Sequence, residues 1–88
     1  MITRTPENNP EWAKRYAEEW GEEPPVMQCV TRCAEIQVDE TGVVSTYVNS
    51  APFESTLDAT PADLADVALA FLTIADKLTT IKENRKCR

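Results

Sequence analysis

Histidine is absent from the 88 residues, and glycine occurs only twice. Without an imidazole, Ser-His-Asp and Cys-His nucleophilic sites cannot form in their usual way, and most catalytic zinc sites lose a customary ligand. The two glycines, Gly21 and Gly42, lie too far apart for a phosphate-binding loop or a dinucleotide fingerprint. These absences predict a non-enzymatic protein with no catalytic residue, no cofactor and no metal.

Long apolar runs are also missing. The longest uncharged apolar stretch, between Asp66 and Asp76, has about nine residues, whereas a membrane-spanning helix needs roughly 20. The first residues lack the apolar region of a signal peptide, so we expect a cytoplasmic protein without membrane contact. In that compartment, cysteines are expected as thiols rather than as a disulfide framework.

The size and charge of the chain limit its class further. A chain of 88 residues allows one small domain with a thin core. The apolar fraction of 42% suffices for that core, and 15 acidic against 9 basic residues give a net charge of −6, which opposes general affinity for nucleic acid. No stretch carries a signature specific to a known family, so function has to be inferred from architecture and surface.

The beginning of the chain predicts a short helix after a flexible lead. Residues 1–9 are interpreted as that lead. Asn9 is a typical N-cap, the next two residues are a proline and an acid, and Gly21 is a typical C-terminal residue, so a helix is predicted over residues 10–20. Two prolines follow soon after and prevent its continuation.

Two groups of side chains on this helix are candidate surfaces. The aromatic residues are spaced by four and share one face, which either covers the strands or binds a partner: Trp12, Tyr16 and Trp20. A cluster of acidic residues spans the end of the helix and is interpreted as a solvated face: Glu18, Glu19, Glu22 and Glu23. We expect a protein partner to use the aromatic face or this acidic face.

From residue 26 the apolar period changes to two, which predicts a β-hairpin over residues 26–48. Its first strand is expected to run unbroken through residue 38, and its second strand follows a turn over residues 39–42. In this register Val38 lies opposite Val43. A lone hairpin is marginal in water, so it needs a helix or a second copy against it.

The cysteines leave several alternatives open. On an unbroken strand, Cys29 and Cys33 share a face at a separation of about 13 Å, which is too far for a disulfide. Inert buried thiols are the favoured interpretation. The alternatives are a redox-active or intermolecular disulfide, with Cys87 as the first candidate, a thiolate metal site without a fourth ligand, or a thiol-dependent enzyme.

The strongest pattern predicts a long amphipathic helix over residues 61–84. Thr60 and Asp63 form a variant of the capping box around a proline at the first helical position. Apolar residues then recur at spacings of three and four: Leu64, Val67, Phe71, Ile74, Leu78 and Ile81. A short helix and a hairpin cover about half to two-thirds of a stripe of about 34 Å, so we expect the stripe to form a homodimer interface. The alternative is a monomer whose hairpin curls along the whole helix.

The end of the chain, residues 85–88, is predicted to be a basic tail. Basic residues gather there and in the preceding turn: Lys82, Arg85, Lys86 and Arg88. They match the negative end of a helix dipole. In a dimer, the two tails would also double the local positive charge, which makes contact with nucleic acid an alternative that the net charge does not favour.

The sequence therefore predicts an α+β domain in the order helix, hairpin, long helix. The favoured function is a small, homodimeric protein-interaction module that binds and modulates another protein, whose identity the residues do not specify. The first alternative is a nucleic-acid-associated regulator that uses paired basic tails. The second is a thiol-dependent enzyme.

Overall fold

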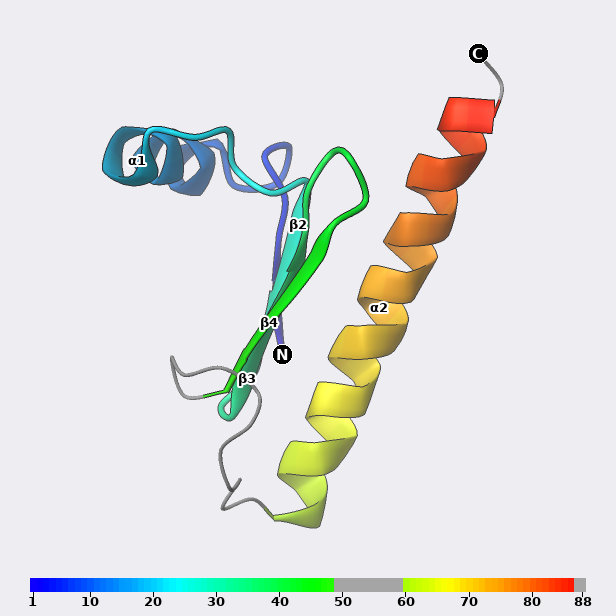
Figure 1. The fold of residues 1–88 in the computed structure, drawn as a ribbon. Helices are drawn as coiled ribbons and strands as arrows, with labels where there is room; N and C mark the ends of the chain where they lie inside the picture. Colours follow the sequence, from blue (N-terminus) through cyan, green and yellow to red (C-terminus); the bar gives the residue numbers. More distant parts are fainter. Residues whose placement is uncertain (49–59, 87–88) are drawn as a thin grey trace.

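The computed structural model describes residues 1–48 and 60–86. In these residues the chain forms a four-stranded antiparallel sheet and two helices (Figure 1). The elements in chain order are β1 (Ile2–Arg4), α1 (Pro10–Trp20), β2 (Met27–Val30), β3 (Ala34–Val38), β4 (Val44–Val48) and α2 (Pro61–Lys86). The predicted α+β class is confirmed, including the short first helix and the long last one.

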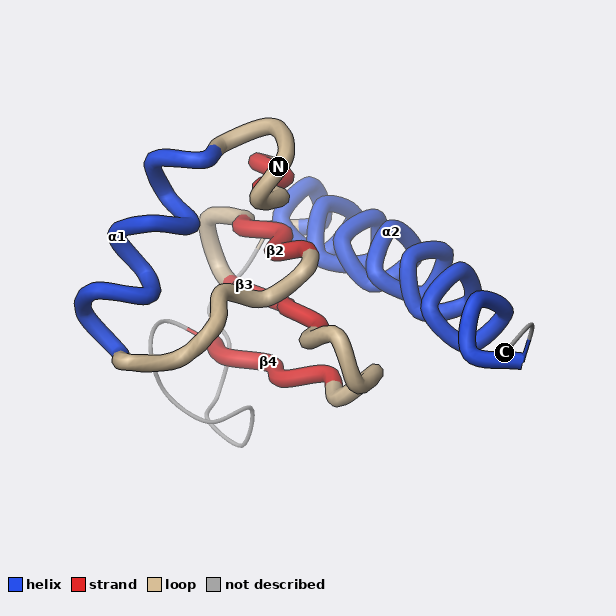
Figure 2. The backbone as a smooth tube through the Cα atoms, turned by 90° about the horizontal axis from the view of Figure 1, so that it is seen from above, coloured by secondary structure: helices blue, strands red, loops and turns tan. Residues whose placement is uncertain are grey.

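The sheet separates the two helices. Its strand order is β1-β2-β3-β4, so each strand pairs with its neighbour in sequence. α2 packs on one face, against β2 and β3, while α1 lies on the other side of the sheet (Figure 2). We call the α2 side the inner face and the α1 side the outer face.

The expectation of one unbroken strand through residue 38 is wrong, because the chain reverses in its middle. β2 ends at Val30, and β3 begins at Ala34 and pairs back along it. The Thr31 backbone N–H donates to the Ala34 carbonyl at 2.8 Å, and the Thr31 hydroxyl oxygen accepts from the Ala34 N–H at 2.9 Å. An unbroken strand would extend about 40 Å with few backbone partners, whereas the reversal lets both halves pair.

This reversal also changes which residues share a face. Cys29 lies opposite Ile36, so both side chains point to the inner face, although on an unbroken strand their odd spacing would have separated them. In the same way Gln28 lies opposite Gln37 on the outer face. The turn therefore sorts the apolar residues inward and the amides outward.

Residues 1–9 are not the flexible lead that the sequence predicts. Ile2 pairs with Val30 and Arg4 pairs with Gln28, which makes β1 an edge strand of the sheet. A strand of three residues is too short for its alternation to be recognised in the sequence. Its partner lies more than twenty residues away, so no local pattern announces the pairing.

The turn between β3 and β4 is present, with a register shifted by one residue from the prediction. Asp39 joins the ladder, because its N–H donates to the Val43 carbonyl at 3.0 Å. Val38 consequently lies opposite Val44 rather than Val43. Gly42 is required in this turn, since its φ is +91° and a Cβ would meet the Leu78 side chain at 3.3 Å.

The core lies between the inner face and α2. Its fully or nearly buried residues are Cys29, Cys33, Ala34, Ile36, Val38, Val67, Ala70 and Ile74. The small Cys and Ala side chains allow α2 to approach the strands closely. At one end, Arg32 of the β2–β3 turn forms a bidentate ion pair with Asp63 of α2.

Asp63 also serves as part of the predicted capping box of α2. The Thr60 N–H donates to the Asp63 carboxylate at 2.9 Å, and the Asp63 N–H donates to the Thr60 hydroxyl at 3.2 Å. Hydrogen bonds from Arg32, followed by those from Thr60, hold the pKa of Asp63 well below its usual value. One carboxylate therefore starts the helix and fastens it to the sheet.

Candidate functional site

The outer face of the sheet carries a network of polar side chains. Gln28 of β2 is only 4% exposed, yet both ends of its amide are engaged. Its carbonyl oxygen accepts from Arg4 of β1 at 3.2 Å, and its amide nitrogen donates to Gln37 of β3 at 3.2 Å and to Glu35 of the same strand. These bonds join three strands and hold the network in one arrangement.

Above this network, α1 presents a row of aromatic rings. Tyr16 lies 6.2 Å, centroid to centroid, from both Trp12 and Trp20, which are one helical turn away on either side. α1 begins as predicted, because the Asn9 side chain accepts from the Trp12 N–H at 3.1 Å. It ends at Gly21, whose φ of +64° is left-handed.

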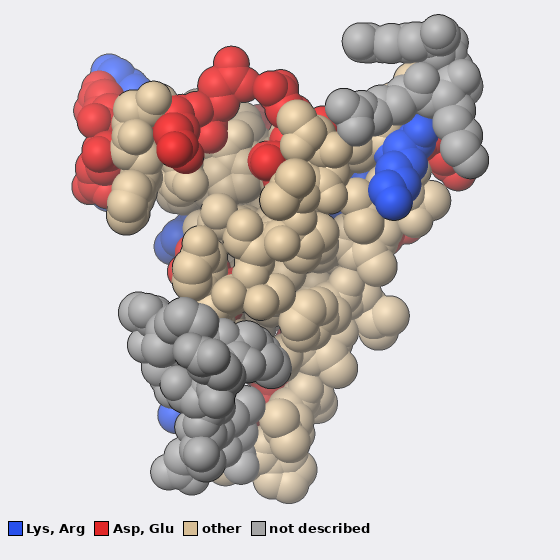
Figure 3. All heavy atoms as spheres, in the orientation of Figure 1, with Lys and Arg blue, Asp and Glu red and all other residues tan. Residues whose placement is uncertain are grey.

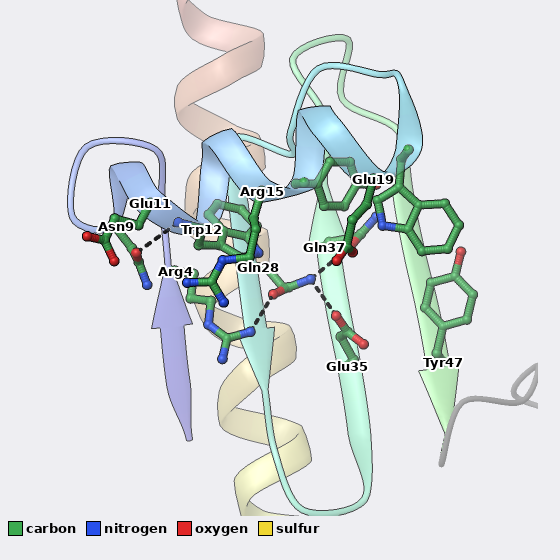
Figure 4. Close-up of a pocket in the computed structure, with 12 residues that line it drawn as sticks. Arg4, Asn9, Glu11, Trp12, Arg15, Glu19, Gln28, Glu35, Gln37 and Tyr47 are labelled. Atoms are coloured by element: carbon green, nitrogen blue, oxygen red, sulfur yellow. Dashed lines mark hydrogen bonds between the residues drawn. The ribbon is translucent and has the colours of Figure 1, made fainter.

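A pocket of about 720 Å³ lies between the aromatic row and the polar network (Figure 4). The network forms its floor, α1 forms one wall, and Tyr47 of β4 closes the far side. α1 buries no residue of its own, so the helix stands off the sheet instead of packing onto it. The floor of the pocket is mostly polar, so it offers α1 little apolar surface to cover.

A second hollow of about 250 Å³ continues this pocket toward the β3–β4 turn. The two hollows share Tyr16, Gln37 and Tyr47, so they lie side by side on the outer face, and together they are called the groove below. The other residues that line the second hollow are Glu22, Glu23, Pro25, Asp39, Val43 and Ser45.

The groove is acidic. Carboxylates along its two hollows are Glu11, Glu19, Glu22, Glu23, Glu35 and Asp39, against the guanidinium groups of Arg4 and Arg15. Figure 3 shows acidic side chains gathered over α1 and the segment that follows it. The Thr41 hydroxyl donates to Asp39 at 2.6 Å, and hydrogen bonds led by this one lower the pKa of Asp39. Its carboxylate therefore stays charged at neutral pH.

The structure brings the three predicted aromatic residues of α1 together at this groove. Trp12 and Tyr16 are half-buried, whereas Trp20 remains 66% exposed at the end of the row. Their role in binding a partner stays a prediction. Of the acidic cluster, Glu19, Glu22 and Glu23 line the groove and Glu18 does not.

The predicted stripe of α2 is divided between two environments. Val67 and Ile74 are buried under the sheet, and Leu78 and Ile81 pack partly against the same core. Leu64 is 53% exposed and Phe71 is 40% exposed. Two leucines outside the predicted stripe are exposed as well, Leu69 at 50% and Leu72 at 67%. The helix thus uses part of its apolar surface for its own core and leaves another part uncovered.

The basic tail and the cysteines add little to this site. Lys82 is exposed on α2, whose backbone continues through Arg85 and Lys86, while Cys87 and Arg88 lie outside the described residues. Cys29 and Cys33 are both buried in the core. Burial raises the pKa of Cys29 against the opposing effect of the Thr3 hydroxyl, which works against a reactive thiolate.

Several residues of the groove were not predicted from the sequence. Gln28, Glu35, Gln37 and Tyr47 come together only because the chain reverses at Thr31 and Asp39. One signal was available, because Gln28 interrupts an otherwise apolar strand pattern. A buried amide of this kind needs partners, and here Arg4, Glu35 and Gln37 supply them.

No protein-family model, curated protein or solved structure matches the chain. Residues 1–48 and 60–86 include no helix long and apolar enough to cross a membrane. Across the same ranges no group of three or more cysteine, aspartate or glutamate side chains is placed to hold a metal ion.

Proposed function

We propose that this chain is a non-enzymatic protein-interaction module that self-associates through α2 and binds another protein to modulate it. The observation that carries the proposal is the uncovered apolar face of α2, which consists of Leu64, Leu69, Phe71 and Leu72 and is hereafter the α2 outer stripe. Monomeric soluble proteins rarely leave such a contiguous apolar patch in water, so it marks an interaction surface.

The lengths of the elements support this proposal. α2 has 26 residues and is about 39 Å long, whereas the longest strands have 5 residues and extend about 17 Å. α2 therefore runs past the sheet at both ends (Figure 1). One sheet of this size cannot cover two sides of such a helix. The side of α2 that faces the sheet is already covered, so the opposite side stays exposed.

Covering the α2 outer stripe would offset part of the free-energy cost of forming a dimer. Complete burial of a Leu or Phe side chain contributes roughly 1.5–3 kcal/mol, so a half-exposed one contributes about 1 kcal/mol more when a partner covers it. Two copies of the α2 outer stripe then supply about 8 kcal/mol, which falls within the about 4–15 kcal/mol that association costs. This gain only offsets the cost of association, so the net affinity of the dimer has to come from contacts outside the stripe.

Charge favours an antiparallel arrangement of the two α2 helices. Residues 61–76 carry three aspartates and no basic residue, whereas residues 77–86 carry four basic residues and one glutamate. An antiparallel pair places the acidic half of each helix beside the basic half of the other, and it also opposes the two helix dipoles. A parallel pair would place like charges together.

The groove on the outer face stays open in this dimer, because α2 lies on the opposite side of the sheet (Figure 2). Each copy then has one surface for self-association and one for a further partner. This division of roles is the basis for a module that joins or modulates another protein.

Light scattering after gel filtration tests the self-association. The wild-type chain is expected at twice its 9.8 kDa mass at micromolar concentration. Leu72→Glu, which places a charge in the α2 outer stripe, is expected to reduce the mass to that of one chain with an unchanged circular dichroism spectrum.

Thr80→Glu is the matched control, because Thr80 is exposed on the same helix outside the α2 outer stripe. It adds the same charge and is expected to leave the dimer intact. A wild-type mass of one chain at these concentrations contradicts the proposal. Dissociation of both variants would show that added charge, rather than the stripe, controls assembly.

A further inference from the structure

We propose that the groove on the outer face binds a basic peptide segment of a partner protein, with an arginine or lysine side chain inserted between the rings of α1 and the polar floor. This inference rests on the proposed function and names the chemistry of its partner. The groove combines two features that a cationic side chain requires, namely aromatic faces and carboxylates, and both line the same two hollows.

The aromatic rings are available to a ligand. Trp20 is 66% exposed and Tyr47 is 42% exposed, and both line the pocket beneath α1. Tyr16, whose ring lies 6.2 Å from that of Trp20, lines both hollows. Such rings attract a guanidinium or ammonium group through their negative faces, and they add apolar area for its carbon stem.

The carboxylates favour the same occupant. Glu19 belongs to the pocket beneath α1, and Glu22 and Glu23 belong to the second hollow, so acidic groups extend along the whole groove. Arg4 is the basic residue of the floor, and one of its guanidinium nitrogens donates to Gln28. Arg15 remains as an opposing charge on the wall, but the carboxylates outnumber both arginines.

The shape and charge of the groove distinguish a peptide from other ligands. The two hollows adjoin along the outer face through the residues that line both, and two adjoining hollows suit an extended chain better than a compact molecule. Repulsion between carboxylates and phosphates disfavours nucleic acid at this surface. The floor amides and the Glu35 carboxylate also offer acceptors for guanidinium N–H groups.

The chain contains its own reporter of this site. Its only two tryptophans, Trp12 and Trp20, both line the pocket, so intrinsic fluorescence reports on the groove without a label. We would titrate the full-length protein with an eight-residue peptide of alternating glycine and arginine. Parallel titrations would use the same peptide with citrulline in place of arginine, and with glutamate in place of arginine.

The arginine peptide is expected to give a saturable change that weakens at high salt, because screening reduces interactions between exposed charges. The citrulline peptide is expected to bind at least tenfold more weakly, and the glutamate peptide to give no saturable change. Equal binding of the arginine and citrulline peptides would overturn the proposal by showing an uncharged apolar site. Preference for the glutamate peptide, or no response to any peptide up to millimolar concentration, would overturn it as well.

Two neighbouring glutamates provide a matched pair of variants. Glu19→Gln removes a carboxylate that lines the pocket and is expected to weaken the arginine peptide about threefold to tenfold. Glu18→Gln removes the same charge from an adjacent position outside the groove and is expected to change affinity by less than twofold. Equal losses of peptide affinity in both variants would show that binding depends on general electrostatic attraction, and they would overturn the proposed pocket.

Two further variants separate this inference from the proposed dimer. Trp20→Leu is expected to weaken the arginine peptide about tenfold while the mass stays that of a dimer. Leu72→Glu is expected to yield single chains that still bind the arginine peptide. If the wild-type protein is dimeric but does not bind the arginine peptide, the proposed pocket is rejected and the dimer stands. If the wild-type protein is monomeric but binds the peptide, the proposed dimer is rejected and the pocket stands.

Discussion

The two faces of the sheet are built from alternate residues of the same strands, yet they differ in almost every physical respect. On the inner face, Cys29, Ile36 and Val38 pack against α2 with little or no exposed surface. On the outer face, Gln28 and Glu35 form hydrogen bonds, and α1 stands away from them across a pocket. Alternation lets one short sheet bury an apolar core on one side and line a polar groove on the other.

On both sides of the sheet, this contrast leaves apolar side chains exposed to water. The inner face attracts a helix whose apolar surface exceeds what the sheet covers, and the excess becomes the α2 outer stripe. The floor beneath α1 is mostly polar, so Trp12 is only half-buried and Trp20 is 66% exposed. Both candidate interaction surfaces therefore arise from the same small size of the domain.

The largest expected loss of stability comes from creating a cavity in the core beneath the inner face. Ile36→Ala removes one of the largest completely buried side chains and is expected to lower the free energy of unfolding by about 4 kcal/mol. Ile2→Ala is the matched control, because Ile2 is 55% exposed at the edge of the outer face. Its expected loss is below about 1 kcal/mol. Urea denaturation measures both, and similar losses would contradict the division between the faces.

A smaller effect is expected from the polar network of the outer face. Gln28→Met keeps the side-chain volume but leaves Arg4, Glu35 and Gln37 without their shared partner, so we expect a loss of about 1–3 kcal/mol. Gln37→Met removes only one of these hydrogen bonds and is expected to cost about half as much. A more stable Gln28→Met variant would show that the network serves the pocket and not the fold.

The smallest effect concerns pH and the attachment of α2. Because the pKa of Asp63 is lower in the folded chain, its ionised form adds stability above the ordinary aspartate pKa of 3.8, and this stability is lost as the pH falls below that value. Asp63→Asn is expected to lower the urea midpoint at neutral pH and to flatten its decline in acid. Asp66→Asn, on the exposed side of the same turn, is expected to retain the decline. An unchanged acid decline in Asp63→Asn would contradict the role of the Arg32 pair.

The helices could be predicted because their signals are local. Asn9 and Gly21 mark the ends of α1, and the capping box of Thr60 and Asp63 marks the start of α2. Capping residues act through hydrogen bonds within a few residues, so the sequence contains both partners of each interaction. The apolar spacing of α2 likewise identified Val67 and Ile74 as facing something apolar.

The strands were harder to predict, because the position of each strand depends on a partner strand elsewhere in the chain. The continuous alternation from residue 26 to residue 38 concealed the reversal at Thr31, and a two-residue turn without glycine or proline gives a weak signal. β1 could not be recognised from the sequence, because its pairing depends on the unpaired edge of β2, which becomes apparent only in the folded sheet. The shift of Val38 by one residue followed from Asp39 joining the ladder.

Local signals in the chain are enough to specify the class of the domain, the positions of its helices, its negative charge and the excess of apolar residues on the last helix, because composition, caps and periodicity act over short distances. The folded structure is needed to know which apolar residues of α2 are covered and to bring Gln28, Glu35, Gln37 and Tyr47 beneath the rings of α1. This difference arises because a strand presents a face only after its register is set. That register comes from pairing across the chain and not from the neighbours of a residue.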